Sequence, residues 1–238
     1  MTDSLVQRYK MTQSVFCDGD KKLNYCFRKT GDWTSAKKAA VVLFLHGAGE
    51  RGDDNERQLV HGAGELTGYC ERNNVKALLL FPQCPEGKQW VDTPWGNESH
   101  TLPEISESMA LVLKMLDKEM ASPEIDHKRI YISGISMGGF GTWDALSRHP
   151  EKFAAAFPVC GGADRAMAER LKDIPILTYH GDRDFVVLTK RTRDIVDAIR
   201  KAGGEKITYI EVPNCAHGSW PVAFAKDANW QWLFEQTL

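Results

Sequence analysis

Short runs of mostly apolar residues recur along this chain and are separated by longer segments of mixed character. The runs are residues 41–45, 77–81, 130–133, 154–159, 175–179 and 207–212. A continuous apolar run of this length is typical of a strand that is buried on both faces of a parallel sheet. Because these runs alternate with segments of helical character, the pattern predicts an α/β fold, with a mostly parallel, twisted sheet and helices on both of its faces.

Four segments between or after these runs are predicted to be helices. In the first, apolar residues recur at steps of three and four up to Met120. Thr101 and Glu104 match a Thr-x-x-Glu capping box, so we expect this helix to begin at Thr101. The other three are residues 137–148, a helix from about Thr189 that ends at a Gly-Gly pair, and a final helix near Pro221.

The first forty residues have a different pattern. Residues 14–17 and 23–27 have extended character, and an Asp-Gly turn signal lies between them. We expect a hairpin that adds an antiparallel edge to the sheet. Since no linker, low-complexity run or repeat interrupts the chain, we expect a single domain over residues 1–238, with residues 1–40 as the hairpin edge and residues 41–238 as the core that carries the chemistry.

Charge and composition exclude several classes of partner. Lys and Arg total 30 against 32 acidic residues, without a long block of either sign, which argues against nucleic acid or a membrane surface. No apolar run approaches 18 residues, so no membrane-spanning helix is expected. The N-terminus lacks the apolar core of a secretory signal, and the six cysteines show no Cys-x-x-Cys spacing. We therefore expect a cytoplasmic protein with free thiols.

The strand at residues 130–133 runs directly into Gly-Ile-Ser-Met-Gly at residues 134–138. Gly-x-Ser-x-Gly between a strand and a helix is the nucleophile elbow, a sharp turn that exposes the serine at the tip of the strand. The glycines lack the β-carbons that would collide as the strand and the helix close together. We therefore predict that Ser136 is a nucleophile.

A serine hydroxyl needs a base to take its proton, normally a histidine that is held by a carboxylate. In elbow-type enzymes the acid and then the histidine follow the serine, on later strand-end loops. His217, in the loop after the last strand, fits the base, whereas His180 is tied too rigidly to a strand end. For the acid we favour Asp184, because the apolar residues after it exclude water. Asp182 has the character of a turn residue, and Asp164 is a third candidate.

The negative charge of a tetrahedral intermediate needs two preorganised N–H donors. One is expected from Met137, the residue after the nucleophile. The other is expected from the glycine-rich loop after the strand at residues 41–45, where we assign Ala48, with Gly47 as the alternative. We expect His46 to have a structural rather than a catalytic role.

Several aromatic and thiol side chains lie in loops at the predicted strand ends. Trp90, Trp95 and Trp220 are candidates for an aromatic wall that binds substrate, and core packing is the alternative for each. Cys160 and Cys215 fall near the site by topology, and we expect them to pack as small apolar side chains.

The histidines do not suggest a metal. His61, His100 and His127 show neither an i, i+4 pair nor the acidic neighbours of a metal site. We therefore predict no metal and no cofactor.

Three stretches resemble α/β-hydrolases, and specifically serine esterases of the dienelactone-hydrolase and phospholipase/carboxylesterase type. They are residues 45–55, 134–141 and 180–187. Similar sequences are also described as predicted peptidases or feruloyl-esterase-like enzymes. The resemblance runs from about residue 41 to the C-terminus. It departs at one position, because dienelactone hydrolases proper use a cysteine where this chain has Ser136.

The resemblance implies that a small-molecule ester is hydrolysed in two steps, through an acyl-enzyme on Ser136. No long apolar insertion of the size of a lid is present, which favours a small soluble ester over bulk lipid. One alternative is a peptidase of the prolyl-oligopeptidase type, which usually carries a large accessory domain. The other is a hydrolase fold that is retained as a non-catalytic binding module.

Overall fold

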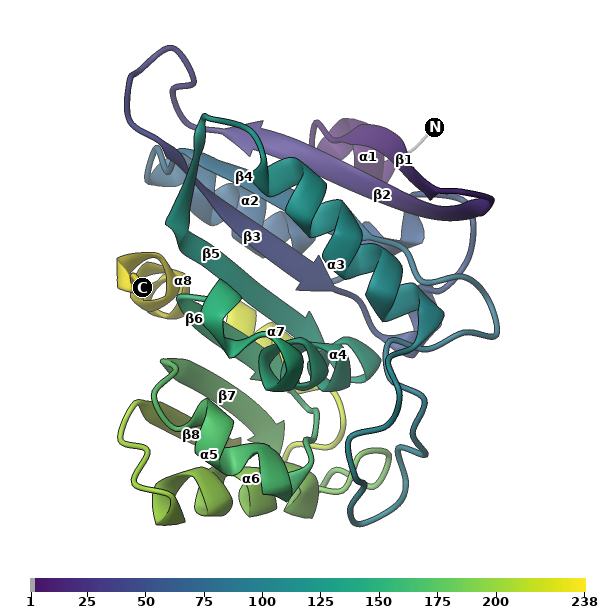
Figure 1. Cartoon of the computed structure of the whole chain (residues 1–238), viewed down its shortest axis with the longest axis vertical. Helices are drawn as coiled ribbons and strands as arrows, with labels where there is room; N and C mark the ends of the chain where they lie inside the picture. The colour runs from purple at the N-terminus through teal and green to yellow at the C-terminus, as the bar shows by residue number, and fades with distance from the viewer. Residues whose placement is uncertain (1–2) are drawn as a thin grey trace.

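One sheet of eight strands forms the centre of the molecule (Figure 1). The computed structural model describes residues 3–238 of the chain. Across the sheet the strands follow the order β1-β2-β4-β3-β5-β6-β7-β8. Their bounds are β1 Thr12–Asp18, β2 Lys21–Thr30, β3 Ala39–Leu45, β4 Ala77–Pro82, β5 Ile125–Ile135, β6 Ala155–Val159, β7 Ile176–Gly181 and β8 Ile207–Val212.

The sheet is antiparallel at one edge only. β1 pairs with β2, and β2 with β4, in antiparallel register, while the other five strand pairs are parallel. β3, β4, β6 and β7 are buried at every position, whereas the edge strand β1 buries Phe16 alone. The predicted mostly parallel sheet with an antiparallel N-terminal hairpin is therefore confirmed.

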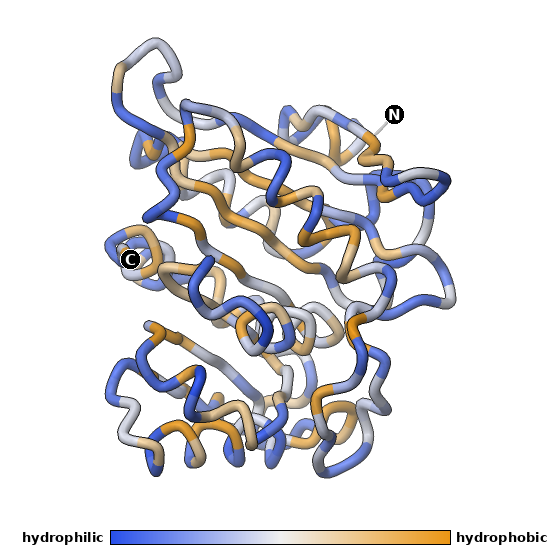
Figure 2. Tube along the Cα trace, in the orientation of Figure 1, coloured by the Kyte–Doolittle hydropathy of each residue, from blue (hydrophilic) through white to orange (hydrophobic). Residues whose placement is uncertain are grey.

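Helices cover both faces of the sheet, as Figure 1 shows, and Figure 2 shows apolar residues concentrated along the central strands. α3, α4, α5 and α6 pack on one face, and α1, α2, α7 and α8 pack on the other. The helices are α1 Leu5–Arg8, α2 Ala63–Arg72, α3 Glu107–Met120, α4 Met137–Arg148, α5 Ala168–Leu171, α6 Lys190–Lys201, α7 Trp220–Phe224 and α8 Asp227–Glu235. Short 3-10 turns are η1 Ala48–Glu50, η2 Arg57–Leu59, η3 Pro150–Lys152 and η4 Arg165–Met167.

The start of α3 differs from the sequence prediction. The helix begins after Ser106, whose hydroxyl accepts a hydrogen bond from the backbone N–H of Met109 at 3.0 Å and caps the helix. The expected cap, Thr101, lies in the preceding loop. That loop is held against another part of the chain, because the N–H of Leu102 donates to the Asp164 carboxylate at 2.9 Å. A tertiary contact therefore overrides the local capping pattern.

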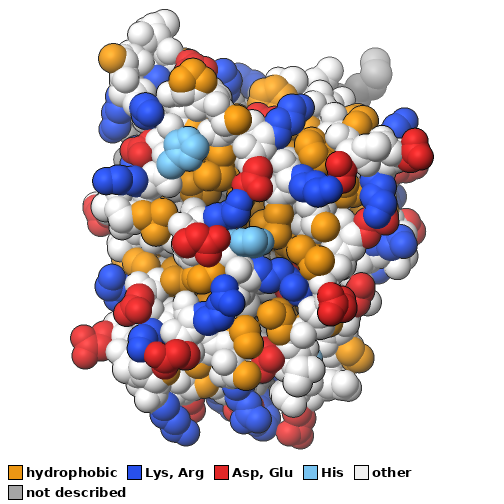
Figure 3. All heavy atoms as spheres, in the orientation of Figure 1, with side chains coloured by type: hydrophobic (Ala, Val, Ile, Leu, Met, Phe, Trp, Pro, Cys, Tyr) orange, Lys and Arg blue, Asp and Glu red, His pale blue; other side chains and the backbone are white. Residues whose placement is uncertain are grey.

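The parallel strands direct their C-terminal ends to the same edge of the sheet, the right-hand edge in Figure 1. The loops that follow β3, β5, β6, β7 and β8 gather there, which is where binding crevices form in open α/β sheets. The face shown in Figure 3 carries basic and acidic side chains intermixed. Within residues 3–238 no helix has the length and apolar character needed to cross a membrane.

Candidate active site

Ser136 lies in the sharp turn between β5 and α4. Its backbone has φ 52° and ψ −117°, and residues other than glycine rarely adopt a positive φ. A β-carbon on Gly138 would lie 1.9 Å from the carbonyl oxygen of Leu45, and one on Gly134 would lie 2.3 Å from the carbonyl oxygen of Gly138. The glycines are therefore required for this close approach, and the turn leaves Ser136 half-buried at the strand tip.

Three side chains from three loops form a continuous hydrogen-bond chain at this edge. His217 Nε2 lies 2.8 Å from Ser136 Oγ, and His217 Nδ1 lies 2.7 Å from Asp184 Oδ2. The other carboxylate oxygen, Asp184 Oδ1, accepts the backbone N–H groups of Val186 and Val187, both at 2.9 Å. The structure therefore brings together the hydroxyl, the imidazole and the carboxylate that the sequence singled out.

The hydrogen bonds around Asp184 keep its carboxylate ionised. Burial by itself raises the pKa of Asp184, but hydrogen bonds from His180, from His217 and from the Val187 backbone outweigh burial and hold the pKa well below its ordinary value. The side chain is buried and negatively charged, and it faces His217. An ionised carboxylate in this place stabilises a proton on the far side of the imidazole.

The two rejected acids have other partners. Asp182 Oδ1 accepts the backbone N–H of Cys215 at 3.1 Å, so it ties the loop after β7 to the loop after β8. Asp164 caps η4 by accepting the N–H of Ala166, and it also accepts that of Leu102. Both carboxylates therefore organise backbone.

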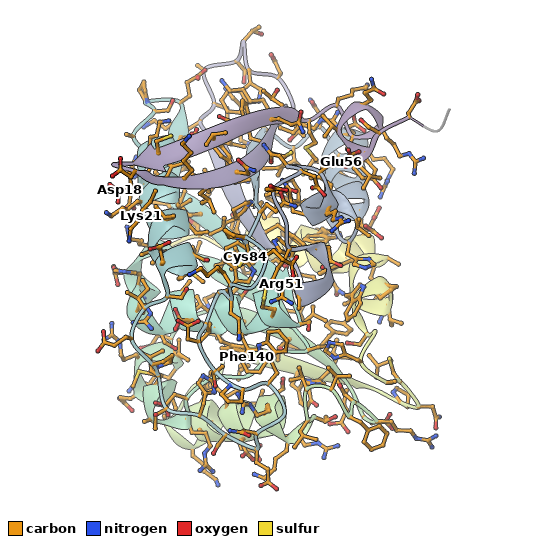
Figure 4. The ribbon with its side chains drawn as sticks, turned by 90° about the vertical axis from the view of Figure 1, so that its right-hand side faces the viewer. Asp18, Lys21, Arg51, Glu56, Cys84 and Phe140 are labelled. Carbon is orange, nitrogen blue, oxygen red and sulfur yellow. The ribbon has the colours of Figure 1, made fainter. Side chains whose placement is uncertain are left out.

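His46 holds the loop after β3 through both ring nitrogens. Its Nε2 accepts the backbone N–H of Cys84 at 2.9 Å, so Nδ1 carries the proton and donates to the Gly47 carbonyl oxygen at 2.6 Å. Burial lowers the pKa of His46 to about 4, which keeps the ring neutral. In a trans peptide the N–H points opposite to the carbonyl, so this contact also fixes the direction of the Ala48 N–H. Figure 4, which looks onto this edge, labels Cys84 and Arg51 beside the loop.

Trp90 does not line the pocket, so the prediction that it contacts substrate is wrong. Its side chain is fully buried, and its indole N–H donates to the His46 carbonyl oxygen at 3.1 Å. The indole also packs edge-on against the His46 ring, with 5.2 Å between centroids. Trp90 therefore supports the loop after β3 from beneath, through this hydrogen bond and this ring contact.

A pocket of about 220 Å³ opens beside Ser136. Trp220 lies edge-on to the His217 ring, with 5.5 Å between centroids, and also packs against His61 at 5.4 Å. Glu50 Oε1 lies 3.8 Å from His61 Nε2. The lining residues, which include two of the three predicted tryptophans, are Gly47, Ala48, Gly49, Glu50, His61, Trp95, Ile135, Ser136, Val186, His217 and Trp220.

A model of the phospholipase/carboxylesterase family matches residues 33–230 of this chain. The chain belongs to the phospholipase/carboxylesterase family. Among solved structures, a thermostable esterase superposes with a TM-score of 0.86 at 33% sequence identity, over 96% of this chain and 63% of that one. This likeness identifies the architecture as the α/β-hydrolase fold, as the sequence resemblance implied.

Two curated relatives differ in how much of their length the match covers. Acyl-protein thioesterase 1 homolog 2 of Dictyostelium discoideum is 26% identical over 195 residues, 76% of this chain and 86% of that protein. A bifunctional acetylxylan esterase/xylanase of Neocallimastix patriciarum is 36% identical over 76 residues, 32% of this chain and 11% of that protein. This family member thus spans most of the first relative, a small part of the second, and less than two thirds of the thermostable esterase.

Cys160 packs beside the hydrogen-bond chain of this esterase-family protein. Its thiol donates to the His217 carbonyl oxygen at 3.1 Å and lies 2.8 Å from Ser219 Oγ. Burial raises the pKa of Cys160 to about 12, so the thiol keeps its proton. The Cys160 sulfur and the potential metal-ligating atoms of Asp184 and His217 all lie within 4.8 Å of one another. Asp184 and His217, however, already hydrogen-bond each other. The thiol therefore supports the histidine loop.

Sequence reasoning missed the roles of three polar residues at this site. Glu50 and His61 line the pocket, and only Glu50 carried a signal, since it lies on the predicted loop two residues after Ala48. On sequence grounds His180 is weighed as a base and is assigned no other role. It is fully buried, and its Nε2 lies 3.0 Å from Asp184 Oδ2. Its position at the end of β7, four residues before Asp184, was the available signal.

Proposed function

We propose that this family member is a serine hydrolase that cleaves small, soluble carboxylic esters through an acyl-enzyme on Ser136. The observation that carries the proposal is the hydrogen-bond chain from Ser136 through His217 to Asp184, with contacts of 2.8 and 2.7 Å. This order of hydroxyl, imidazole and carboxylate is the arrangement that makes a serine nucleophilic.

The reaction has two symmetrical halves. His217 Nε2 takes the Ser136 proton as Oγ attacks the ester carbonyl carbon, and the resulting imidazolium is stabilised by Asp184. When the tetrahedral intermediate collapses, the alkoxide leaves with that proton and the acyl group stays on Oγ. A water molecule then gives a proton to His217 and attacks the acyl carbon. Collapse releases the carboxylic acid and returns the proton to Ser136.

Stabilisation of the oxyanion needs two backbone N–H donors. Met137 is the first residue of α4, where the backbone N–H has no acceptor within the helix. The peptide before Ala48 is oriented by the contact between His46 and the Gly47 carbonyl. We assign the Met137 and Ala48 N–H groups to the oxyanion hole, and each such donor contributes roughly 3–4 kcal/mol to transition-state stabilisation.

The pocket favours a short substrate. Its volume of about 220 Å³ is below the roughly 300–1,000 Å³ that is typical of sites for drug-sized ligands. Ile135, Trp95 and Trp220 give it apolar walls, while the Glu50 carboxylate disfavours a second negative charge. Val186 lines the pocket, and its neighbour Phe185 is 85% exposed. These features support a neutral ester with a small acyl group.

Hydrolysis of p-nitrophenyl esters of increasing acyl length tests the proposal. We expect the highest kcat/KM between acetate and butyrate, and Ser136→Ala should abolish turnover. The matched control is Ser133→Ala, on the same strand, which removes a fully buried hydroxyl that donates to the Phe157 carbonyl oxygen. This control should retain ester hydrolysis.

Covalent labelling separates an enzyme from an inert binding module. A fluorophosphonate should modify Ser136 alone, as located by mass spectrometry of the digested protein. Labelling at Cys160 or Cys215 would contradict the assignment of the nucleophile, and an absence of labelling would favour a non-catalytic module. Faster cleavage of peptide p-nitroanilides than of the matching esters would favour a peptidase.

A further inference from the structure

One carboxylate oxygen at this site receives two imidazoles. Asp184 Oδ2 lies 2.7 Å from His217 Nδ1 and 3.0 Å from His180 Nε2. His217 is the base in the proposed reaction, but that reaction gives His180 no part. His180 is therefore a fully buried histidine that contacts the proposed catalytic acid but has no step in the proposed reaction.

The contacts of His180 determine where its proton lies. Nε2 faces two acceptors, Asp184 Oδ2 and the Val187 carbonyl oxygen at 2.9 Å, so this nitrogen must carry a hydrogen. Nδ1 lies 2.7 Å from the hydroxyl of Thr192, which itself lies 2.9 Å from the Gly161 carbonyl oxygen. His180 is thereby fixed from both sides, by α6 and by the loop after β7.

We propose that His180 is a positioning residue for the hydrolase reaction: its Nε2–H donates to Asp184 Oδ2, orients the carboxylate toward His217, and sets how strongly that carboxylate holds a proton on His217. The inference rests on the proposed function. His180 does not line the pocket and has no exposed surface, so it acts through Asp184 and does not touch the substrate.

Because His180 and His217 share one carboxylate oxygen, the direction in which loss of His180 changes the Asp184–His217 bond can be predicted. A carboxylate that accepts two N–H groups gives each less electron density than it gives one alone, because each donor partly neutralises its charge. Loss of the His180 donor leaves Asp184 a stronger acceptor for His217 and stabilises the imidazolium. The neutral base then forms only at higher pH, so the acid limb of the kcat/KM profile should move upward.

Other ionisable groups surround this pair of imidazoles. Glu211 on β8 lies opposite His180 in the strand register. Its carboxylate makes a two-point contact with the guanidinium of Arg193 on α6, which neutralises its charge. Cys160, Asp182 and Cys215 approach from the loops after β6, β7 and β8, and Glu50 and His61 share the pocket lining with His217.

The main test is His180→Leu, with kcat, KM and the pH profile measured on a short p-nitrophenyl ester. We expect kcat to fall by about 10- to 100-fold, the range for loss of one hydrogen bond to a charged group. KM should stay within about twofold, and the acid limb should rise by about one pH unit. His180→Gln, whose amide N–H can reach the same oxygen, should recover part of both changes.

Two further variants separate positioning from folding. Thr192→Val removes the hydroxyl that anchors His180 Nδ1 and should move the acid limb in the same direction by a smaller amount. Ile199→Ala creates a cavity under the same helix without touching His180, and it should lower the unfolding temperature while leaving the acid limb unmoved. If His180→Leu does not fold, Thr192→Val decides the question.

A spectroscopic readout makes the inference independent of ester turnover. The proton between His217 Nδ1 and Asp184 should give a downfield ¹H resonance that shifts in His180→Leu and in Thr192→Val but not in Ile199→Ala. An acid limb and a resonance that both stay unmoved in folded His180→Leu would overturn the inference. A wild-type protein without hydrolase activity would instead overturn the proposed function, and the resonance would still test the contact.

Discussion

β3 and β7 lead into the site through the same dipeptide, His-Gly, yet only one of the two histidines contacts a charged side chain. His46 follows β3 and His180 lies at the end of β7, and their side chains are 1% and 0% exposed. His46 bonds only backbone, namely the Cys84 N–H and the Gly47 carbonyl oxygen. His180 bonds the Asp184 carboxylate, besides the Val187 carbonyl oxygen and the Thr192 hydroxyl.

The difference assigns each loop a separate task. In the proposed reaction the His46 loop presents an N–H group to developing negative charge, which a neutral histidine that fixes a peptide plane suits. In the same proposal the loop after β7 presents the Asp184 carboxylate to developing positive charge on His217, and His180 donates a hydrogen bond to that carboxylate. The same dipeptide therefore serves either polarity, and the residue that meets the imidazole determines which.

The largest effect is expected on the carboxylate side, in Asp184→Asn. We expect kcat/KM to fall by about 10³- to 10⁴-fold, because a neutral amide cannot stabilise the imidazolium of His217 and can impose the wrong tautomer. The matched control is Asp182→Asn, which keeps an acceptor for the Cys215 N–H and should stay within about tenfold of wild type. Equal losses of kcat/KM in the two variants would contradict the assignment of Asp184 as the acid.

The next largest effect is expected on the backbone side, in His46→Leu. Loss of both imidazole contacts leaves the Gly47 carbonyl with the long 3.4 Å hydrogen bond from the Glu50 N–H, so the Gly47–Ala48 peptide should loosen. Removal of one oxyanion donor costs about 10²- to 10³-fold in kcat. The acid limb of the pH profile should not move, in contrast to His180→Leu, because His46 is not bonded to the base. A shifted limb in His46→Leu would remove the distinction between the two loops.

His46 should also make stability depend on pH. Its pKa is about 4 in the folded state, below the unfolded value of 6.5, so the unfolded chain binds the proton more tightly. The cost to folding is absent above pH 6.5, grows as the pH falls, and is complete below pH 4, where it reaches about 3 kcal/mol. Urea unfolding of wild type and His46→Leu between pH 7 and pH 4 should show a shallower decline in the variant. Parallel declines would exclude a buried neutral His46.

The sequence predicted what depends on local pattern. The apolar runs predicted the central strands, and Gly-x-Ser-x-Gly, with its strand and helix context, predicted the turn at Ser136. Loop order then selected His217, and the apolar residues after Asp184 favoured it over Asp182; the structure brings His217 and Asp184 within hydrogen-bond distance of each other. The failures concern contacts between distant segments. Trp90 meets a carbonyl 44 positions away, and the loop before α3 meets Asp164. Neither contact can be predicted from the sequence around Trp90 or around the loop before α3.

The smallest predicted effect separates Trp90, which supports the His46 loop, from Trp95, which lines the pocket. Trp90→Phe keeps an aromatic ring but removes the N–H that donates to the His46 carbonyl oxygen. We expect a loss of about 1 kcal/mol in unfolding free energy and a fall of a few fold in kcat, with KM unchanged. The indole N–H of Trp95 has no hydrogen-bond partner among residues 3–238, so Trp95→Phe should leave stability unchanged and alter KM. A changed KM with an intact kcat in Trp90→Phe would contradict the role of Trp90 in supporting the His46 loop. The contrast between the strand ends at His46 and His180 would then lose one of its observations.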